Sequence, residues 1–201
     1  MALFGLSSAL ANPPFLRGEG VYLRLPEMRD FEAWSELRRA SRAFLTPWEP
    51  VWAEDDLSRG SFRRRVRRHV QEMEAEEAYA FLIFREIDDA LVGGLTLGHL
   101  RRGVSQAATL GYWMGAPHAG QRYMSRAVRA ATGFAFANLR LHRIEAACLP
   151  HNNASVRLLE ATGFRREGLA RAYLRIAGQW QDHLLFGLLE SDSPTHGVRR
   201  G

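Results

Sequence analysis

The chain has a single cysteine, Cys148, and no lysine among its 201 residues. One cysteine cannot form an internal disulfide, and no cysteine and histidine pairs stand at the spacing of a zinc site. The sequence therefore gives no sign of a bound metal, and it favours a reducing compartment. We expect a cytoplasmic protein.

Long hydrophobic runs are also missing. No stretch approaches the roughly 18 apolar residues that a membrane-spanning helix needs. The apolar start, residues 1–11, has no basic residue before Arg17, so it lacks the positive region with which a signal peptide begins. These features argue against a membrane protein and against export.

What the chain does have is positive charge and a regular pattern of elements. Its formal net charge is +5, with arginine as the basic residue, so acidic partners such as phosphates, acidic peptides or nucleic acid are favoured. Apolar periodicity predicts strands at residues 21–25, 78–87, 91–100, 108–114, 143–149, 168–176 and 183–189, and helices at about 27–38, 58–77, 120–139 and 152–161.

This order of elements predicts an α/β fold. A strand–helix–strand–helix stretch that follows a hairpin is typical of one mixed sheet with helices on its faces. We expect residues 1–19 to be an N-terminal extension, 20–190 to be the domain and 191–201 to be a disordered polar tail.

The connection after the strand at 108–114 predicts an anion site. The strand is followed by a short loop and by a helix that starts near residues 120–125. Free backbone N–H groups and the positive end of the helix would point at one place, where a pyrophosphate could bind. The alternative is a plain strand-to-helix connection.

The segment 143–164 carries a family resemblance. It contains Pro-His-Asn-Asn-Ala-Ser at 150–155 and Gly-Phe at 163–164, and similar motifs stand at 45–50, 167–168 and 178–183. Over about residues 20–190 the chain resembles the GNAT superfamily of N-acetyltransferases, and within it the RimJ/RimL ribosomal-protein-alanine acetyltransferases, with the RimJ type closest. The resemblance implies a mostly antiparallel sheet with helices on both faces, and acetyl-coenzyme A as cosubstrate.

The resemblance also implies where the cosubstrate binds. It would lie where the strand that ends at Met114 parts from the strand of 145–149, with its pyrophosphate on the N–H groups of 120–125. The strand N–H near Trp113 would polarise the thioester oxygen. The cofactor-binding residues implied in this way are Trp113, Met114, Gly120, Gln121, Arg122, Tyr123, Met124, Ser125 and Asn152.

The chain departs from the family pattern at the phosphate loop. Ala119 stands where the superfamily usually has Gln, and Arg122 stands where it usually has Gly. Arg122 could clash with the phosphate or add a contact to it. We expect binding to be retained, since the rest of the pattern is present.

The acid and the base are less regular. Leu159 replaces the tyrosine that acts as acid in many members, so Ser155 is the candidate acid, or else only bonds within its helix. Ala172 falls near the RimL base position and cannot serve. Glu145 remains as base or water-holding group, or has a structural role in its strand, and His151 is a third possibility.

The chemistry favours an α-amine acceptor. An α-amine titrates near 8 and lysine near 10.4, so lysine costs about 3 kcal/mol more to deprotonate at neutral pH. We therefore predict an acetyltransferase acting on a protein N-terminal α-amine, with the N-terminal Ala of a small-subunit ribosomal protein as acceptor. The alternatives are a small amine, such as an antibiotic or polyamine, and a non-catalytic coenzyme A-binding factor associated with ribosomes.

Two further segments have open interpretations. The helix near 59–70 carries Arg59, Arg63, Arg64, Arg65, Arg67 and Arg68, which form either a solvated helix face or a contact with ribosomal RNA or an acidic substrate. The aromatic loop, residues 44–52, either walls the peptide-binding cleft or covers the edge of the sheet.

Overall fold

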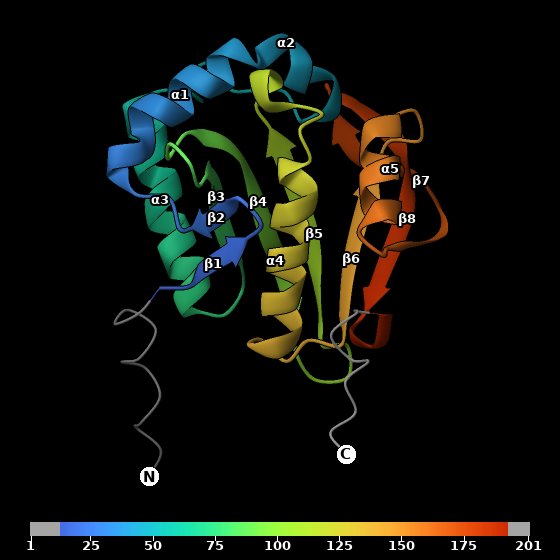
Figure 1. The fold of residues 1–201 in the computed structure, drawn as a ribbon. Helices are drawn as coiled ribbons and strands as arrows, with labels where there is room; N and C mark the ends of the chain where they lie inside the picture. The colour runs from blue at the N-terminus through green and yellow to red at the C-terminus, as the bar shows by residue number, and fades with distance from the viewer. Residues whose placement is uncertain (1–12, 193–201) are drawn as a thin grey trace.

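Eight strands of the computed structural model form one sheet, in the order β1-β2-β3-β4-β5-β6-β8-β7 (Figure 1). The structure describes residues 13–192, so the predictions for residues 1–12 and 193–201 lie outside the described residues. Only β5 and β6 pair in parallel; the other neighbouring strands are antiparallel. The strands are β1 (Phe15–Gly18), β2 (Val21–Arg24), β3 (Tyr79–Arg85), β4 (Leu91–Arg101), β5 (Ala107–Met114), β6 (Arg143–Cys148), β7 (Arg165–Ile176) and β8 (Gln179–Leu189).

Helices cover both faces of this sheet. α4 packs across β1, β2 and β4 and contacts α5, whereas α1 and α3 pack against β4 and β3. The helices are α1 (Phe31–Ala40), α2 (Arg42–Leu45), α3 (Arg59–Glu74), α4 (Tyr123–Ala137) and α5 (Asn153–Ala161), with 3-10 turns η1 (Met28–Asp30), η2 (Thr46–Trp48), η3 (Ala116–His118) and η4 (Glu190–Asp192). The predicted fold class is confirmed. None of the helices in the described range is long and apolar enough to cross a membrane.

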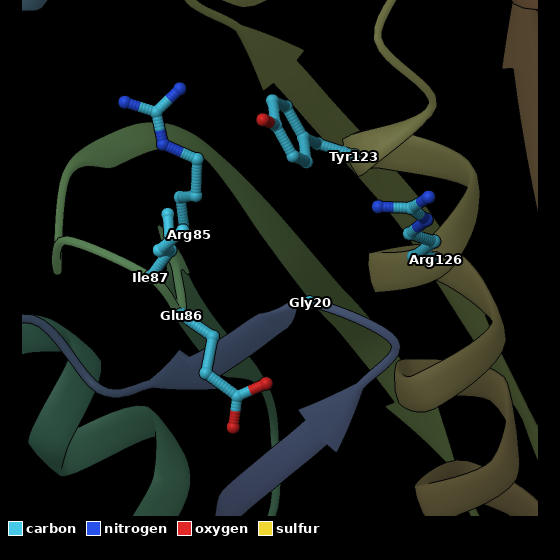
Figure 2. A pocket seen from close by; sticks show the side chains of 6 residues that line it. All are labelled: Gly20, Arg85, Glu86, Ile87, Tyr123 and Arg126. Carbon is cyan, nitrogen blue, oxygen red and sulfur yellow. The ribbon is translucent and has the colours of Figure 1, made fainter.

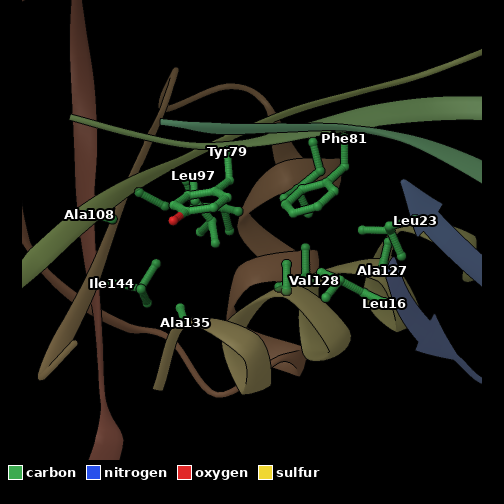
Figure 3. Close-up of a cluster of buried hydrophobic side chains, with 14 of the residues drawn as sticks. Leu16, Leu23, Tyr79, Phe81, Leu97, Ala108, Ala127, Val128, Ala135 and Ile144 are labelled. Atoms are coloured by element: carbon green, nitrogen blue, oxygen red, sulfur yellow. The ribbon is translucent and has the colours of Figure 1, made fainter. Parts of the chain in front are cut away.

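The larger core lies between the sheet and α4 (Figure 3). Ala127, Val128, Ala131 and Ala135 repeat at helical spacing and are fully buried. Because most of these side chains are small, the helix can lie close to the strands. This packing fixes the start of α4 relative to the ends of the central strands, where the predicted phosphate loop lies.

The smaller core lies on the opposite face, under α1 and α3. Trp34 of α1 and Phe62 of α3 pack with their ring centroids 4.8 Å apart, over Leu82 and Phe84 of β3. Helix α3 begins as the sequence predicts, because the Ser58 hydroxyl accepts a hydrogen bond from the N–H of Ser61 at 3.1 Å.

Several features of the fold differ from the sequence prediction; β7 and β8, for example, begin at Arg165 and Gln179, earlier than expected. β1 adds four residues to the sheet before residue 20, because Leu16 is buried under α4. Pro13 and Pro14 do not interrupt this strand, since they lie just before it. The segment expected to be a loop after α1 folds into the short helices α2 and η2. Leu45 is buried there, which a pattern of only a few residues does not reveal.

Candidate active site

The parallel strands β5 and β6 part before they end. Their pairing stops at Leu110 with Ala146. β5 then continues beside β4 to Met114, and β6 continues beside β8 to Cys148. The facing edges of residues 111–114 and 147–148 therefore have unpaired N–H and C=O groups. An extended ligand with amide groups, such as a pantetheine arm, fits between them like an added strand.

The start of α4 lies beyond the end of β5. Gly120 has a φ of 76° and Arg122 a φ of 62°, so two left-handed residues turn the chain into the helix. The first helical hydrogen bond runs from the N–H of Arg126 to the carbonyl oxygen of Arg122 at 3.2 Å. The N–H groups of Tyr123, Met124 and Ser125 precede it and have no acceptor in the helix. Such a helix end is a candidate anion site, at the place where the sequence predicts the pyrophosphate.

The left-handed φ also explains the departure at Arg122. Glycine adopts this conformation without strain, whereas an arginine costs roughly 1–2 kcal/mol there. Arg122 nevertheless takes the conformation that a glycine would take, and its side chain is exposed. The backbone of the loop is therefore left-handed at Arg122 although this residue is not glycine.

The candidate acid, Ser155, lies in the first turn of α5. Its N–H donates to the Asn152 side-chain oxygen at 3.1 Å, so Asn152 caps the helix. The Tyr112 hydroxyl of β5 donates to the Ser155 hydroxyl oxygen at 3.1 Å. Burial raises the pKa of Tyr112 to about 12, so it keeps its proton. Ser155 is left with its own hydrogen to donate.

Tyr112 is a site residue that the sequence prediction missed. Alternation along β5 places it on the same face as Leu110 and Met114, two residues beyond the last pair of β5 with β6. This alternation is the sequence signal that could have placed Tyr112 on that face. The pair formed by Tyr112 and Ser155 joins β5 to α5 beside the unpaired strand edges.

Glu145 lies in the paired part of β6, opposite Thr109, on the face away from α4. Its carboxylate accepts hydrogen bonds from Arg101 and Arg143, and Arg143 also pairs with Glu167. Burial acts to raise the pKa of Glu145, but the two arginines together lower it. A carboxylate held in this way is a weak proton acceptor, which supports the structural alternative.

The aromatic loop spans from α2 to the turn between β7 and β8. The carbonyl oxygen of Glu49 accepts a hydrogen bond from the N–H of Ala177, at 2.9 Å. Trp48 packs against the exposed His151 with the two rings tilted at 41° and their centroids 5.5 Å apart. The loop therefore bridges the end of the sheet at which β5 and β6 part. His151 has its ring engaged on this loop.

A buried ion pair holds the aromatic loop to α1. Both terminal nitrogens of Arg38 donate to the carboxylate of Glu49 at 2.7 Å, and the Trp52 ring nitrogen donates to the same carboxylate at 2.7 Å. The guanidinium lies 4.2 Å from the Trp52 ring centre and 4.9 Å from that of Trp113. The loop, α1 and the end of β5 are thus one connected unit.

These features make the end of the sheet where β5 and β6 part the candidate site, and a comparison with known families identifies the family of the chain. Residues 21–165 match the family described as Acetyltransferase (GNAT) domain. The chain belongs to the GNAT acetyltransferase family. This confirms the predicted family and, with it, acetyl-coenzyme A as the cosubstrate.

Individual GNAT relatives match over nearly the whole chain. It is 37% identical to the probable N-acetyltransferase YjcK of Bacillus subtilis, over 88% of this chain and 98% of the relative. It is 32% identical to the ribosomal protein uS5-alanine N-acetyltransferase of Escherichia coli, over 94% of this chain and 97% of the relative. The structure of Mycobacterium smegmatis RimJ in complex with CoA-disulfide superposes with a TM-score of 0.83 at 33% identity. The match covers 90% of this chain and 88% of that structure's chain.

One open pocket of this GNAT domain lies away from the parted strands (Figure 2). It has a volume of about 330 Å³ and lies between the start of α4, the β1–β2 turn and the β3–β4 hairpin. Tyr123 and Arg126 line it from α4, and Arg85 lines it from β3. In the sheet, β4 and β5 lie between β3, which lines this pocket, and β6.

Proposed function

We propose that this chain transfers acetyl from acetyl-coenzyme A to the N-terminal α-amine of a cytoplasmic protein, with the N-terminal Ala of a small-subunit ribosomal protein as acceptor. The observation that carries acetyl transfer is the parting of β5 and β6 next to the free N–H groups of α4. The acceptor class is supported by the E. coli relative, which is named for alanine acetylation of ribosomal protein uS5.

Each element of the site has a role in this proposal. Acetyl-coenzyme A supplies an acetyl thioester. The unpaired N–H groups near Trp113 and Met114 polarise its carbonyl oxygen, and those of residues 120–125 hold the phosphates. Ser155, supported by Tyr112, donates a proton to the departing sulfur.

The aromatic loop supports a chain terminus as acceptor. Because it bridges from α2 to the β7–β8 turn, it limits the width of the approach to the parted strands. A flexible N-terminus presents one small residue with its amine at the tip, and it can enter where a folded surface cannot. An α-amine also needs less help to lose its proton than lysine does.

The test uses two peptides. One has a free N-terminal Ala; the other has the same sequence with a blocked N-terminus and one internal Lys. We expect acetylation of the first only, at a rate that rises with pH through about 8 as the α-amine loses its proton. The enzyme has no lysine, so any acetyl-lysine found by mass spectrometry comes from the peptide. Preferential acetylation of the blocked peptide would contradict the proposed acceptor.

The predicted RNA contact would rest on part of α3. Four of its arginines pair with acidic side chains of the protein, as Arg64 does with Asp55 and Arg65 with Asp56. Arg63 and Arg67, one helical turn apart, are exposed and have no ion-pair partner within residues 13–192. Replacing both with Ala should weaken binding to ribosomal particles at low salt and leave peptide turnover unchanged. Unchanged particle binding would favour the solvated-face interpretation.

A further inference from the structure

His183 is a buried histidine that the roles above do not use. It lies in β8 and is 3% exposed. The next residue, Leu184, pairs with Cys148 at the end of β6 and packs in the core on the α4 side. Because successive side chains of a strand alternate between faces, His183 projects to the opposite face. It does so one residue beyond the last pair of β6 with β8, at the end of the sheet where β5 and β6 part.

The imidazole of His183 has one nitrogen engaged and one free. Nδ1 lies 3.0 Å from the carbonyl oxygen of Gln181, which can only accept, so Nδ1 carries the hydrogen. The neutral ring then keeps its lone pair on Nε2. Nε2 has no hydrogen-bond partner in residues 13–192. It is also absent from the buried, unpartnered polar atoms of that range, so it reaches accessible space. His183 is therefore oriented as a proton acceptor.

A β-bulge holds this orientation. Residues 171–173 of β7 stand opposite the single residue Asp182 of β8. The Ala172 N–H donates to the Asp182 carboxylate at 2.8 Å, and Ala172 has a left-handed φ of 47°. The bulge brings the Tyr173 ring edge-on to His183, with centroids 5.8 Å apart. Bulges often aim side chains beside active sites.

The bulge also lies where the family resemblance places a base. Ala172 lies near that position and has no carboxylate, and Glu145 is held by two arginines. Tyr173 contacts the His183 ring, and the Asp182 carboxylate is turned to the bulge. The free Nε2 of His183 is then the basic atom beside the position where the family resemblance implies a carboxylate.

We propose that Nε2 of His183 takes the proton from the acceptor amine, directly or through one water; this rests on the proposed function. The amine nitrogen forms a bond to the acetyl carbon and the carbon–sulfur bond breaks. The proton leaves the nitrogen for His183, and the sulfur receives one from the Ser155 hydroxyl. Charge and protons balance, and the protein returns to its starting state by exchange with water.

The test is His183→Asn, with His142→Asn as its control. The asparagine amide can still donate to the Gln181 carbonyl but has no basic nitrogen. With the free N-terminal Ala peptide, kcat should fall by roughly 100-fold or more, while acetyl-coenzyme A affinity and Tm stay unchanged. A peptide with an aminooxy terminus is neutral at pH 7 and forms a more acidic adduct, so it depends less on the base and should lose less than about tenfold. His142, exposed at the other end of β6, should show neither effect.

Three outcomes would overturn the assignment of His183. A variant with unchanged kcat shows that no base is needed there, and equal losses on the two acceptors show a positioning role only. If His183→Asn does not fold, His183→Gln gives the same comparison with its amide near the Nε2 position, and equal losses there overturn the assignment too. The proposed function fails separately, if the wild type acetylates small amines but no peptide. In that case, kcat of His183→Asn and of the wild type on such an amine would be compared to test whether His183 is the base.

Discussion

The hydroxyl pair of Tyr112 and Ser155 makes the sharpest prediction for single residues. Ser155→Ala removes the hydrogen that reaches the sulfur, so kcat should fall by roughly 100-fold while the Kd for acetyl-coenzyme A changes less than about threefold. Tyr112→Phe removes only the supporting hydrogen bond and should cost less, roughly tenfold. Tyr22→Phe, which removes a hydroxyl on β2 bonded to Asp89, is the control. Unchanged kcat in Ser155→Ala would make Ser155 a structural residue.

Arg122→Gly tests the phosphate loop. Glycine relieves the left-handed conformation, so the free energy of unfolding should rise by up to about 1 kcal/mol. The exposed guanidinium is expected to contact phosphate, so cosubstrate affinity should fall several-fold at low salt and less at high salt. Arg140→Gly is the matched control, because Arg140 also has a left-handed φ, 55°, but lies away from the loop. It should gain the same stability with unchanged affinity; equal affinity in both variants would assign phosphate binding to the backbone alone.

Whether the sequence predicts a site residue depends on how far apart in the sequence the contacting residues lie. The phosphate loop and Ser155 lie within short continuous motifs, so the string of residues is enough to suggest them. Tyr112 meets a residue 43 positions later, and His183 depends on a bulge in a neighbouring strand. Neither contact has a local pattern. Glu145 was ambiguous for the same reason, since Arg101 lies 44 positions before it.

Among the elements, the connection of α1 to the aromatic loop is the one to test. Arg38→Lys keeps the charge but loses the two-pronged bond to Glu49 and the stacking on Trp52 and Trp113. Arg38 is buried and Glu49 half-buried, so we expect a loss of about 2–4 kcal/mol in unfolding free energy. The KM for the peptide should rise more than the KM for acetyl-coenzyme A. Exposed Arg39→Lys is the control, and wild-type melting and KM in Arg38→Lys would show that the loop is not held this way.

Sequence patterns predict the long elements and miss the short ones for a physical reason. β4, β5 and α4 span enough residues for their apolar period to show, and each bounds the site. β1 and α2 have only four residues each and owe their structure to one buried leucine, Leu16 or Leu45. The parting of β5 from β6 has no sequence period at all, because it is a property of two strands; only the family resemblance implied it.

For the molecule as a whole, the parted strands divide the sheet into two halves joined by four residue pairs of β5 and β6. A ligand between residues 111–114 and 147–148 would complete the hydrogen bonding across this junction. Acetyl-coenzyme A at one hundred times its Kd should add about 2.7 kcal/mol to the unfolding free energy, or roughly 5–10 °C in Tm. Hydrogen exchange should slow in those two segments, whereas adenosine 3′,5′-bisphosphate, which lacks the pantetheine arm, should protect only residues 120–125. A melting point unmoved by millimolar cosubstrate would contradict binding at this junction. Protection confined to 120–125 with the full cosubstrate would place the arm elsewhere and leave the two halves unbridged.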